Sequence, residues 1–194
     1  MILVTLGTHE QPMRRLVPIL TSLSTLRPEM GPFHIQHGTT ALPAGWQGEA
    51  LVGPRELSEL MRSADIIITH GGPATIGEAR ATGKVPIVVP RQRRFGEHVD
   101  DHQLWYARRL DAAREIILVE EALQLIGAIE RYSELARAIP APRAHNSRRA
   151  VLRFRQIADA MVADQLSAGV ARGYARGRAK PGQSVTGYPK PPIR

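Results

Sequence analysis

Residues 65–78 read DIIITHGGPATIGE, and this stretch decides the fold. The three isoleucines at 66–68 indicate a strand that is buried on both faces. The glycine pair at 71–72 allows a sharp turn after that strand, and Pro73 suits the first turn of a helix, where its missing N–H is no loss. The pattern therefore predicts a strand, a glycine turn and a helix whose first free N–H groups form a ready anion site.

The predicted helix carries a threonine and a glutamate on one face. Thr75 and Glu78 are three residues apart, so both side chains lie near the start of the helix on the same side. We therefore expect a phosphate-bearing ligand at the carboxyl end of a parallel sheet. The dinucleotide fingerprint G-x-G-x-x-G and the P-loop G-x-x-x-x-G-K-[ST] are both absent from the sequence, so the predicted anion site is neither of these two.

The rest of the chain alternates between short apolar runs and segments of helical period. Strands are predicted at residues 1–6, 33–37, 49–52, 66–68, 85–89 and 116–119. Besides the helix that begins at Pro73, helices are predicted at residues 11–26, 54–63, 97–110, 120–138 and 146–166. Pro18 should either kink the first of these helices or mark its start. The alternation predicts an α/β fold with a single Rossmann-like, doubly wound parallel sheet.

Charge separates the body of the chain from its end. The 194 residues carry a net charge of +8, but residues 1–139 are nearly neutral and the excess of Lys and Arg follows them. A neutral body argues against a nucleic-acid-binding protein. Residues 167–194 are rich in Gly, Pro, Arg and Lys, so we expect a disordered tail that is either simply solvated or attracted to anionic lipid. The expected domains are a folded unit at 1–166 and this tail at 167–194.

Composition also indicates the cellular compartment in which the protein is expected. The chain has no cysteine, which excludes disulfides and thiolate metal sites and is compatible with a reducing cytosol. No apolar run approaches the roughly 20 residues that a membrane helix needs. The opening residues 1–6 are too short for a signal peptide and resemble a first strand. We expect a cytoplasmic protein.

Three motifs carry a resemblance to a known family. They are HGGPATxxE at residues 70–78, GKxP at 83–86 followed by a Pro90 loop, and DHQ at 101–103. Together they resemble the C-terminal nucleotide-sugar-binding domain of GT-B glycosyltransferases, nearest to family 28, which includes the lipid II-forming N-acetylglucosaminyltransferase. The opening VTLGT at 4–8 and the loop at 91–103 are similar to the small catalytic subunits of split enzymes, namely the yeast-type asparagine-linked glycosylation subunit and its bacterial exopolysaccharide counterparts.

The resemblance implies a role for each motif. Glu78 should accept hydrogen bonds from the ribose hydroxyls of a UDP-sugar, while the helix start at Gly72 holds its diphosphate with a hydrogen bond from His70. The side chains at 101–103 should meet the sugar hydroxyls, and the arginines at 91–94 should add positive charge near the diphosphate. The full expected donor-binding set is Gly7, Thr8, His70, Gly71, Gly72, Ala74, Thr75, Glu78, Arg91, Arg93, His98, Asp101, His102 and Gln103.

The chain departs from the family in length, because a full GT-B enzyme has two such domains. The resemblance therefore implies the donor-binding catalytic subunit of a two-component inverting glycosyltransferase. It implies transfer from a UDP-sugar to a polyprenyl-diphosphate-linked saccharide in exopolysaccharide or envelope glycan synthesis. The arginines favour glucuronate as the sugar, with galactose and N-acetylglucosamine still open. A membrane-anchored second subunit would supply the acceptor half at the inner face of the cytoplasmic membrane.

The chemistry of such a transfer leaves one role unfilled. An inverting enzyme needs a general base on the acceptor hydroxyl, and His9 in the first loop is a weak candidate for it. No metal cofactor is expected, because hydrogen-bond donors aimed at the leaving pyrophosphate stabilise its charge.

Other interpretations remain beside this one. A non-catalytic nucleotide-sugar-binding module with a regulatory role would carry the same motifs, and a nucleic-acid-binding protein driven by the basic tail is a third possibility. His98 and His102 have the i, i+4 spacing of metal ligands on a helix, beside Asp101. No third-ligand cluster is evident, however, and the sugar site uses the same residues.

Overall fold

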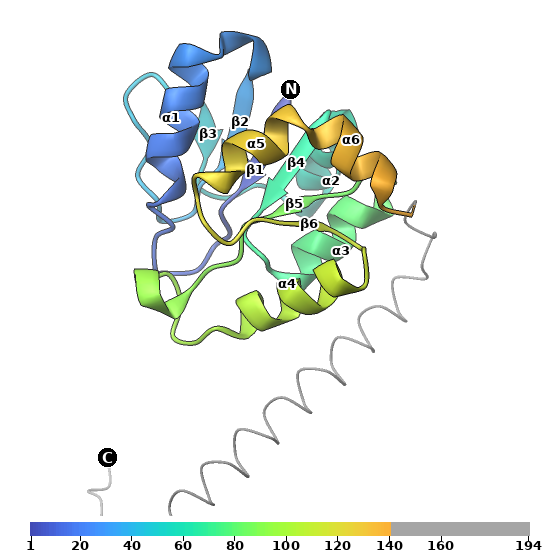
Figure 1. The fold of residues 1–194 in the computed structure, drawn as a ribbon. Helices are drawn as coiled ribbons and strands as arrows, with labels where there is room; N and C mark the ends of the chain where they lie inside the picture. Colours follow the sequence, from blue (N-terminus) through green and yellow to red (C-terminus); the bar gives the residue numbers. More distant parts are fainter. Residues whose placement is uncertain (141–194) are drawn as a thin grey trace, which may run out of the picture. The chain divides into compact units, whose positions relative to one another are not determined.

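One parallel sheet organises the protein. The computed structural model describes residues 1–140, and in this part of the chain six strands pair in the order β3-β2-β1-β4-β5-β6, all of them parallel. The strands are β1 Ile2–Thr5, β2 Phe33–Gln36, β3 Gly48–Glu49, β4 Ile66–Thr69, β5 Ile87–Val88 and β6 Ile117–Leu118. This confirms the predicted doubly wound α/β fold (Figure 1).

The strand order reverses between β1 and β4. From β1 the chain moves outward to β2 and β3, then returns to place β4 on the other side of β1. Ile2 pairs with Ile66 and Thr5 with Thr69, so the loops that follow the two strands leave the sheet side by side. In open parallel sheets this reversal leaves a crevice at the carboxyl ends of the strands, where ligands bind.

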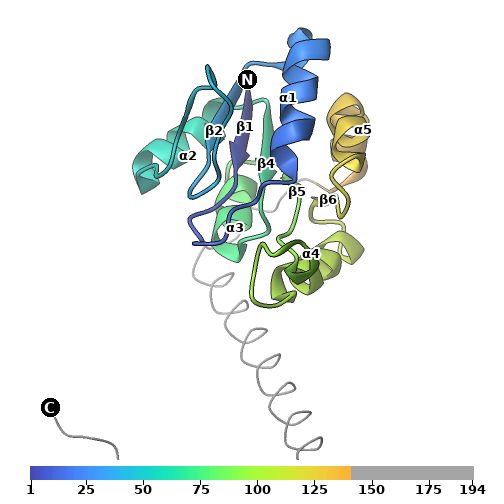
Figure 2. The ribbon, with the colours of Figure 1, turned by 90° about the vertical axis from the view of Figure 1, so that its left-hand side faces the viewer.

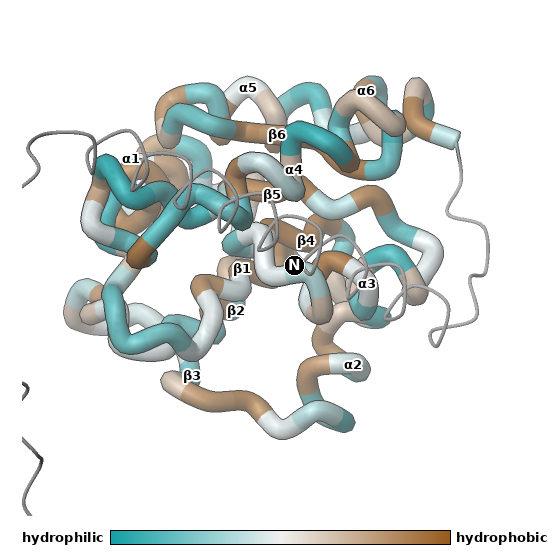
Figure 3. The backbone as a smooth tube through the Cα atoms, turned by 90° about the horizontal axis from the view of Figure 1, so that it is seen from below, coloured by the Kyte–Doolittle hydropathy of each residue, from teal (hydrophilic) through white to brown (hydrophobic). Residues whose placement is uncertain are grey.

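Helices cover both faces of the sheet. They are α1 Leu16–Leu26, α2 Pro54–Ser63, α3 Pro73–Ala81, α4 His102–Ala112, α5 Gln124–Glu130 and α6 Tyr132–Ala138, with short 3-10 turns η1 Pro28–Met30 and η2 Arg93–Phe95. Helices α1, α5 and α6 pack on one face, and α2, α3 and α4 pack on the other. Figures 2 and 3 show the two layers from the side and from below.

Alternating side chains on each strand supply both cores. On β4, Ile68 packs toward α1 and α5, whereas Ile67 packs toward α2 with Met61. On β5, Ile87 and Val88 divide in the same way, and Val88 meets Ala107 of α4. A strand buried on both faces needs apolar side chains at consecutive positions, which explains the isoleucine run.

Two helices begin later than their sequence patterns predict. The helix expected at 11–26 begins at Leu16, which puts Pro18 in the first turn, where proline is tolerated. The helix expected at 97–110 begins at His102. Gly96 has a left-handed backbone with φ of 67°, which an α-helix does not adopt, and the carboxylate of the buried Glu97 is held by Arg15 and by the Gln92 amide.

Three further boundaries differ from the prediction. The helix expected at 120–138 is two helices that part at Arg131. The strand expected at 85–89 is shortened to Ile87–Val88, because Pro86 and Pro90 cannot donate to a ladder. The strand expected at 49–52 lies at Gly48–Glu49. The predicted helix at 146–166 and the predicted tail at 167–194 lie outside the described residues. Among residues 1–140, no helix has the length and apolar character required to cross a membrane.

Candidate functional site

Two glycine loops meet around one imidazole at the point where the strand order reverses. The loop after β1 begins with Gly7, and the loop after β4 contains His70, Gly71 and Gly72. A Cβ atom on Gly7 would lie 2.7 Å from Nε2 of His70, and one on Gly72 would lie 2.5 Å from the same atom. Side chains at these two glycines would therefore displace the ring. Gly7 and Gly71 also have φ of 80° and 89°, which favour glycine.

His70 is held in one orientation by a backbone carbonyl. Its Nδ1 lies 3.2 Å from the carbonyl oxygen of Thr5. A carbonyl only accepts, so Nδ1 carries the proton and Nε2 of the neutral ring carries a lone pair. Burial, reinforced by the positive charge of Arg91, lowers the pKa of His70 to about 4, so the ring is neutral at pH 7. The hydrogen bond from His70 to a diphosphate, expected from the family resemblance, then requires proton uptake as the anion binds.

Helix α3 starts without a side-chain cap. Gly72 is the N-cap residue, with φ of −65° and ψ of 124°, and Pro73 follows it. The first backbone bond of the helix is donated by Ile76 to Gly72 at 2.9 Å. The amides of Ala74 and Thr75 lie in the first turn, where no helix carbonyl can accept from them. They are suited to an anion, as the sequence predicts.

One turn further along α3, Glu78 is exposed on the helix surface, and Thr75 is partly buried. A ligand whose phosphate meets the start of α3 can therefore present a neighbouring diol to the Glu78 carboxylate.

The side chain of Gln36 is hydrogen-bonded to the backbone amide and carbonyl of Gly7. The amide of Gly7 donates to Oε1 of Gln36 at 3.1 Å, and Nε2 of Gln36 donates to the Gly7 carbonyl at 3.2 Å and to the Ala50 carbonyl at 2.9 Å. The N–H of Gly7 is therefore already used, so Gly7 provides space for a ligand and not a donor. Thr8 is the next residue and is exposed. Sequence reasoning missed Gln36; the one available signal was a polar residue at the end of an apolar strand.

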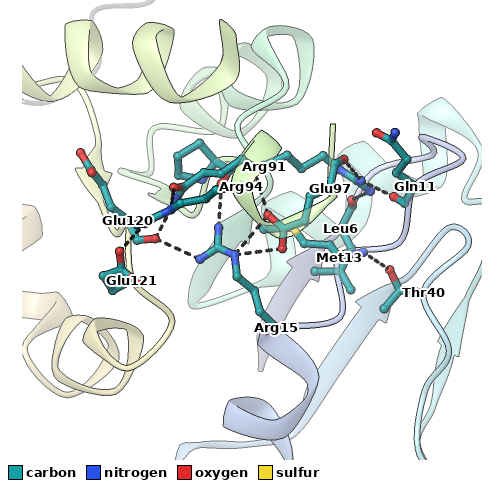
Figure 4. A network of polar contacts seen from close by, with 12 residues as sticks. Leu6, Gln11, Met13, Arg15, Thr40, Arg91, Arg94, Glu97, Glu120 and Glu121 are labelled. Carbon is teal, nitrogen blue, oxygen red and sulfur yellow. Dashed lines mark hydrogen bonds and ion pairs between the residues drawn. The ribbon is translucent and has the colours of Figure 1, made fainter. Parts of the chain in front are cut away.

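Arg91 lies beneath the site and not in it. Its side chain is 0% exposed, and its guanidinium donates to the carbonyls of Leu6 at 2.7 Å, Glu97 at 2.8 Å and Gln11. A side chain with no accessible surface cannot touch a ligand, so the expected contact between Arg91 and the diphosphate is not supported. Arg91 instead ties the loop after β1 to the loop after β5 (Figure 4).

Glu97 joins the same network from the other side. Its carboxylate is 1% exposed and accepts from Nε of Arg15 at 2.9 Å and from the amide of Gln92 at 3.1 Å. Arg15 also donates to the carbonyls of Pro90 at 2.7 Å and Glu120 at 3.0 Å. No local pattern in the sequence marks this pair, because the two residues are 82 positions apart.

The remaining arginines of the loop are at the surface. Arg93 is exposed, and its backbone N–H donates to Oδ1 of Asp101 at 2.8 Å. Arg94 pairs with Glu121 and lies 4.5 Å from the centre of the Phe95 ring. Arg93 is therefore the member of the expected pair whose side chain can reach a ligand, while one oxygen of Asp101 serves to hold the loop.

The start of α4 is brought against the second glycine turn. Gln103 is 7% exposed, and its Oε1 accepts from the Arg91 amide at 3.3 Å. A Cβ atom on Gly71 would lie 3.4 Å from Cβ of Gln103. The carboxamide NH₂ of Gln103 is thus the side that can donate to a ligand.

Three histidines gather beside this turn. The ring centres of His9 and His98 are 4.5 Å apart, and those of His98 and His102 are 4.6 Å apart. Burial chiefly lowers the pKa of His98, assisted by the charge of His102. His98 precedes α4, so the predicted placement of His98 and His102 on one helix is wrong, although the two rings still meet. Asp100, which the sequence analysis did not select, lies between them.

The structure therefore brings six of the fourteen expected residues into contact at one edge of the sheet. Contacts join Gly7, His70, Gly72, Gly71, Gln103 and Arg91 directly. A hollow of about 500 Å³ lies elsewhere, between β6, α5 and α6, and is lined by none of the expected residues. The strand reversal and the glycine contacts, and not this hollow, locate the candidate site.

The chain is similar to a protein-family model and to a curated relative. The family model described as "Glycosyltransferase family 28 C-terminal domain" matches residues 1–161. A curated relative from Rhodospirillum rubrum is named UDP-N-acetylglucosamine–N-acetylmuramyl-(pentapeptide) pyrophosphoryl-undecaprenol N-acetylglucosamine transferase. It is 37% identical over 81 residues, which are 41% of this chain and 20% of the relative. The chain thus matches about a fifth of that relative's length.

The chain is also similar to two solved structures. The glycotransferase of kitacinnamycin has a TM-score of 0.48 at 22% identity, over 80% of this chain and 42% of that one. SnogD from Streptomyces nogalater has a TM-score of 0.42 at 21% identity, over 78% of this chain and 42% of that one. The chain spans less than half the length of either protein.

Proposed function

Because the chain belongs to glycosyltransferase family 28, through the C-terminal domain of that family, we propose that it binds a UDP-sugar and supplies the donor half of a glycosyltransferase. The observation that carries the proposal is the His70 ring, which is enclosed by Gly7 and Gly72 next to the uncapped start of α3. An uncapped helix start at the carboxyl edge of a parallel sheet is a strong anion site.

The residues around this point suit the three parts of the donor. The diphosphate is placed against the amides of Ala74 and Thr75, and the ribose hydroxyls donate to Glu78. The sugar extends toward the start of α4, where Gln103 donates and Arg93 offers a positive charge. This arrangement uses one anion site, one carboxylate and one group of sugar-facing side chains.

Departure of UDP is the step that these residues assist. As the acceptor oxygen bonds to the anomeric carbon, the bond from that carbon to the diphosphate breaks and the pyrophosphate takes up the electron pair. Backbone amides already aimed at the diphosphate stabilise that charge, without a metal being required. A diphosphate also favours the protonated form of His70, which then donates from Nε2.

The acceptor hydroxyl must lose a proton to a general base. His9 is a weak candidate, because its Nδ1 already accepts from the Gln11 amide at 3.3 Å. We therefore propose that a second, membrane-anchored subunit supplies the base together with the acceptor site.

The acceptor proposed is a polyprenyl-diphosphate-linked saccharide in exopolysaccharide or envelope glycan synthesis, at the inner face of the cytoplasmic membrane. One fact supports this choice: the name of the curated relative from Rhodospirillum rubrum contains a pyrophosphoryl-undecaprenol acceptor. UDP-glucuronate is the proposed donor, because the exposed Arg93 can pair with a sugar carboxylate.

Calorimetric titration of the full chain with UDP tests the donor site. We expect Glu78→Ala to weaken UDP binding at least about tenfold, or 1.4 kcal/mol. Glu59→Ala is the matched control, since Glu59 is an exposed glutamate on α2, away from the glycine turns. Unchanged affinity in Glu78→Ala would remove Glu78 from the ribose role, and no UDP binding by the unmodified chain would overturn the proposal.

Catalysis is tested separately by mixing the chain with membranes that contain the partner subunit and measuring release of UDP from UDP-glucuronate. Release that depends on both components supports a two-part transferase. If UDP binds but no donor sugar gives release with any partner, the chain is a regulatory nucleotide-sugar-binding module.

A further inference from the structure

Alternate residues of the loop before α4 converge on one point. His98, Asp100 and His102 each offer one ligand atom, and the three atoms lie within 4.8 Å of one another. Nδ1 of His98 is 3.2 Å from Oδ1 of Asp100, and Nδ1 of His102 is in contact with the same oxygen. The side chains of the two intervening residues do not join this group: Val99 is 63% exposed, and the carboxylate of Asp101 accepts from the Arg93 amide.

Both ends of this run are fixed by the fold. The residue before His98 is Glu97, whose buried carboxylate is held by Arg15 and by the Gln92 amide. His102 is the first residue of α4, and its amide donates to Oδ1 of Asp100 at 3.1 Å. The three side chains therefore converge as part of a braced loop, as a preorganised ligand set requires.

Hydrogen bonding alone does not satisfy the cluster well. Nδ1 of His98 faces the Asp100 amide at 3.4 Å and the Asp100 carboxylate at 3.2 Å. One ring nitrogen cannot accept from the first and donate to the second at the same time. A cation between the two imidazoles and the carboxylate would satisfy all three groups, because each can direct a lone pair at it.

We propose that His98, Asp100 and His102 form a binding site for a divalent transition metal ion of the zinc type. Two imidazole nitrogens and one carboxylate oxygen are ligands that suit Zn²⁺ and its neighbours better than Mg²⁺ or Ca²⁺. Neighbouring ligand atoms on a tetrahedral zinc are roughly 3.3 Å apart for bonds of about 2.0 Å. The 3.2 Å between His98 and Asp100 matches this spacing, whereas His102 and Asp100 are hydrogen-bonded and must move apart when the ion binds.

Three protein ligands leave one coordination position open, as in sites where a metal contacts a bound molecule. The ring of His9 borders the cluster through its contact with His98. His98 and His102 are metal ligands in this inference, in place of the direct sugar contacts expected from the family resemblance. The site stands on these residues alone and does not depend on UDP binding, and the proposed diphosphate site at α3 uses none of them.

Calorimetric titration of tag-free, chelator-treated full chain with Zn²⁺ tests the site. We expect one ion to bind with a Kd near or below about 1 μM. His98→Ala and His102→Ala should each weaken binding about tenfold or more. His34→Ala is the control and should leave the affinity unchanged, because His34 lies on β2 and pairs with Glu49, outside the proposed ligand set.

Cobalt substitution gives a second measurement. Co²⁺ in a four-coordinate site of this ligand set absorbs visible light, and we expect those bands to be lost in the His98→Ala/His102→Ala variant. Circular dichroism of each variant checks that the fold is retained. Absence of Zn²⁺ binding to the unmodified chain, or binding that survives in the folded double variant, would overturn the inference.

Discussion

The contact between His70 and the second glycine loop is open to a direct test by Gly72→Ala. The backbone at Gly72 has φ of −65° and ψ of 124°, which alanine adopts without strain. The added Cβ would lie 2.5 Å from Nε2 and 3.0 Å from Cε1 of His70, so the ring must move. Movement strains the hydrogen bond to Thr5 and the packing against Gly7, for which overpacking of about 1–3 kcal/mol is typical.

A double-mutant cycle isolates this effect. Removal of the ring in His70→Ala should make the second change harmless, so Gly72→Ala should cost about 1–3 kcal/mol in the parent chain and close to zero in the His70→Ala chain. Urea unfolding of the full chain, followed by circular dichroism, measures each corner of the cycle.

Gly77→Ala provides the matched control on the same helix. Apart from its chain neighbours and the nearby backbone of α3, no heavy atom of residues 1–140 lies within 4 Å of a Cβ placed on Gly77, and alanine stabilises a helix interior by roughly 0.5–1 kcal/mol relative to glycine. We therefore expect Gly77→Ala to be neutral or stabilising. Additive effects of Gly72→Ala and His70→Ala would refute the placement of the ring between the two glycines.

Two further predictions concern the buried charges beneath the site. Arg91→Met should lower the free energy of unfolding by about 3 kcal/mol or more, because the carbonyls of Leu6, Gln11 and Glu97 lose a buried donor. Urea titration checks this, and the exposed Arg93→Met is expected to change stability by less than about 0.5 kcal/mol. Stability should fall as the pH falls from 6.5 toward 4, because the pKa of His70 is lowered from 6.5 to about 4 in the folded chain and the unfolded chain therefore binds more protons in that window. The loss should approach about 3 kcal/mol at the low end, and unfolding curves of His70→Asn that keep the same slope between these pH values would contradict the assignment.

Local patterns predicted those parts of the fold that depend on local residues. The isoleucines of β4 and the apolar period of α2 indicate, within a few positions, which faces of each element are buried. Both elements were predicted within a residue of their bounds. The strand order was not predicted, because no short segment encodes which neighbour a strand will take. The start of α4 was misplaced for a related reason, since the carboxylate of Glu97 pairs with Arg15, which lies 82 positions away.

In the candidate site, too, local features were predicted and long-range contacts were not. Gly71 and Gly72 were identified from the turn that the sequence predicts after β4, and Gly7 from the family resemblance. The ring of His70 explains why glycine is needed at positions 7 and 72, and the backbone of Pro90 explains it at position 71. The hydrogen-bond partner of each donor could not be predicted from the sequence, because the partners lie far along the chain. The Gly7 amide is used by Gln36, 29 positions away, and the Arg91 guanidinium by Leu6, 85 positions away.

The burial of Arg91 changes how its charge acts at the site. The positive charge of Arg91 lowers the pKa of His70, so its field extends to the ring between the two glycines. A cation fixed beneath an anion site attracts a diphosphate without reorganising when the ligand arrives, and low-dielectric surroundings strengthen that attraction. Glu97 offsets part of this charge, but its carboxylate is directed toward Arg15 and the Gln92 amide. Arg91 is therefore expected to support UDP binding through the positive potential of its guanidinium and through the hydrogen bonds that hold both loops. For direct contact with a ligand, its side chain would first have to become exposed.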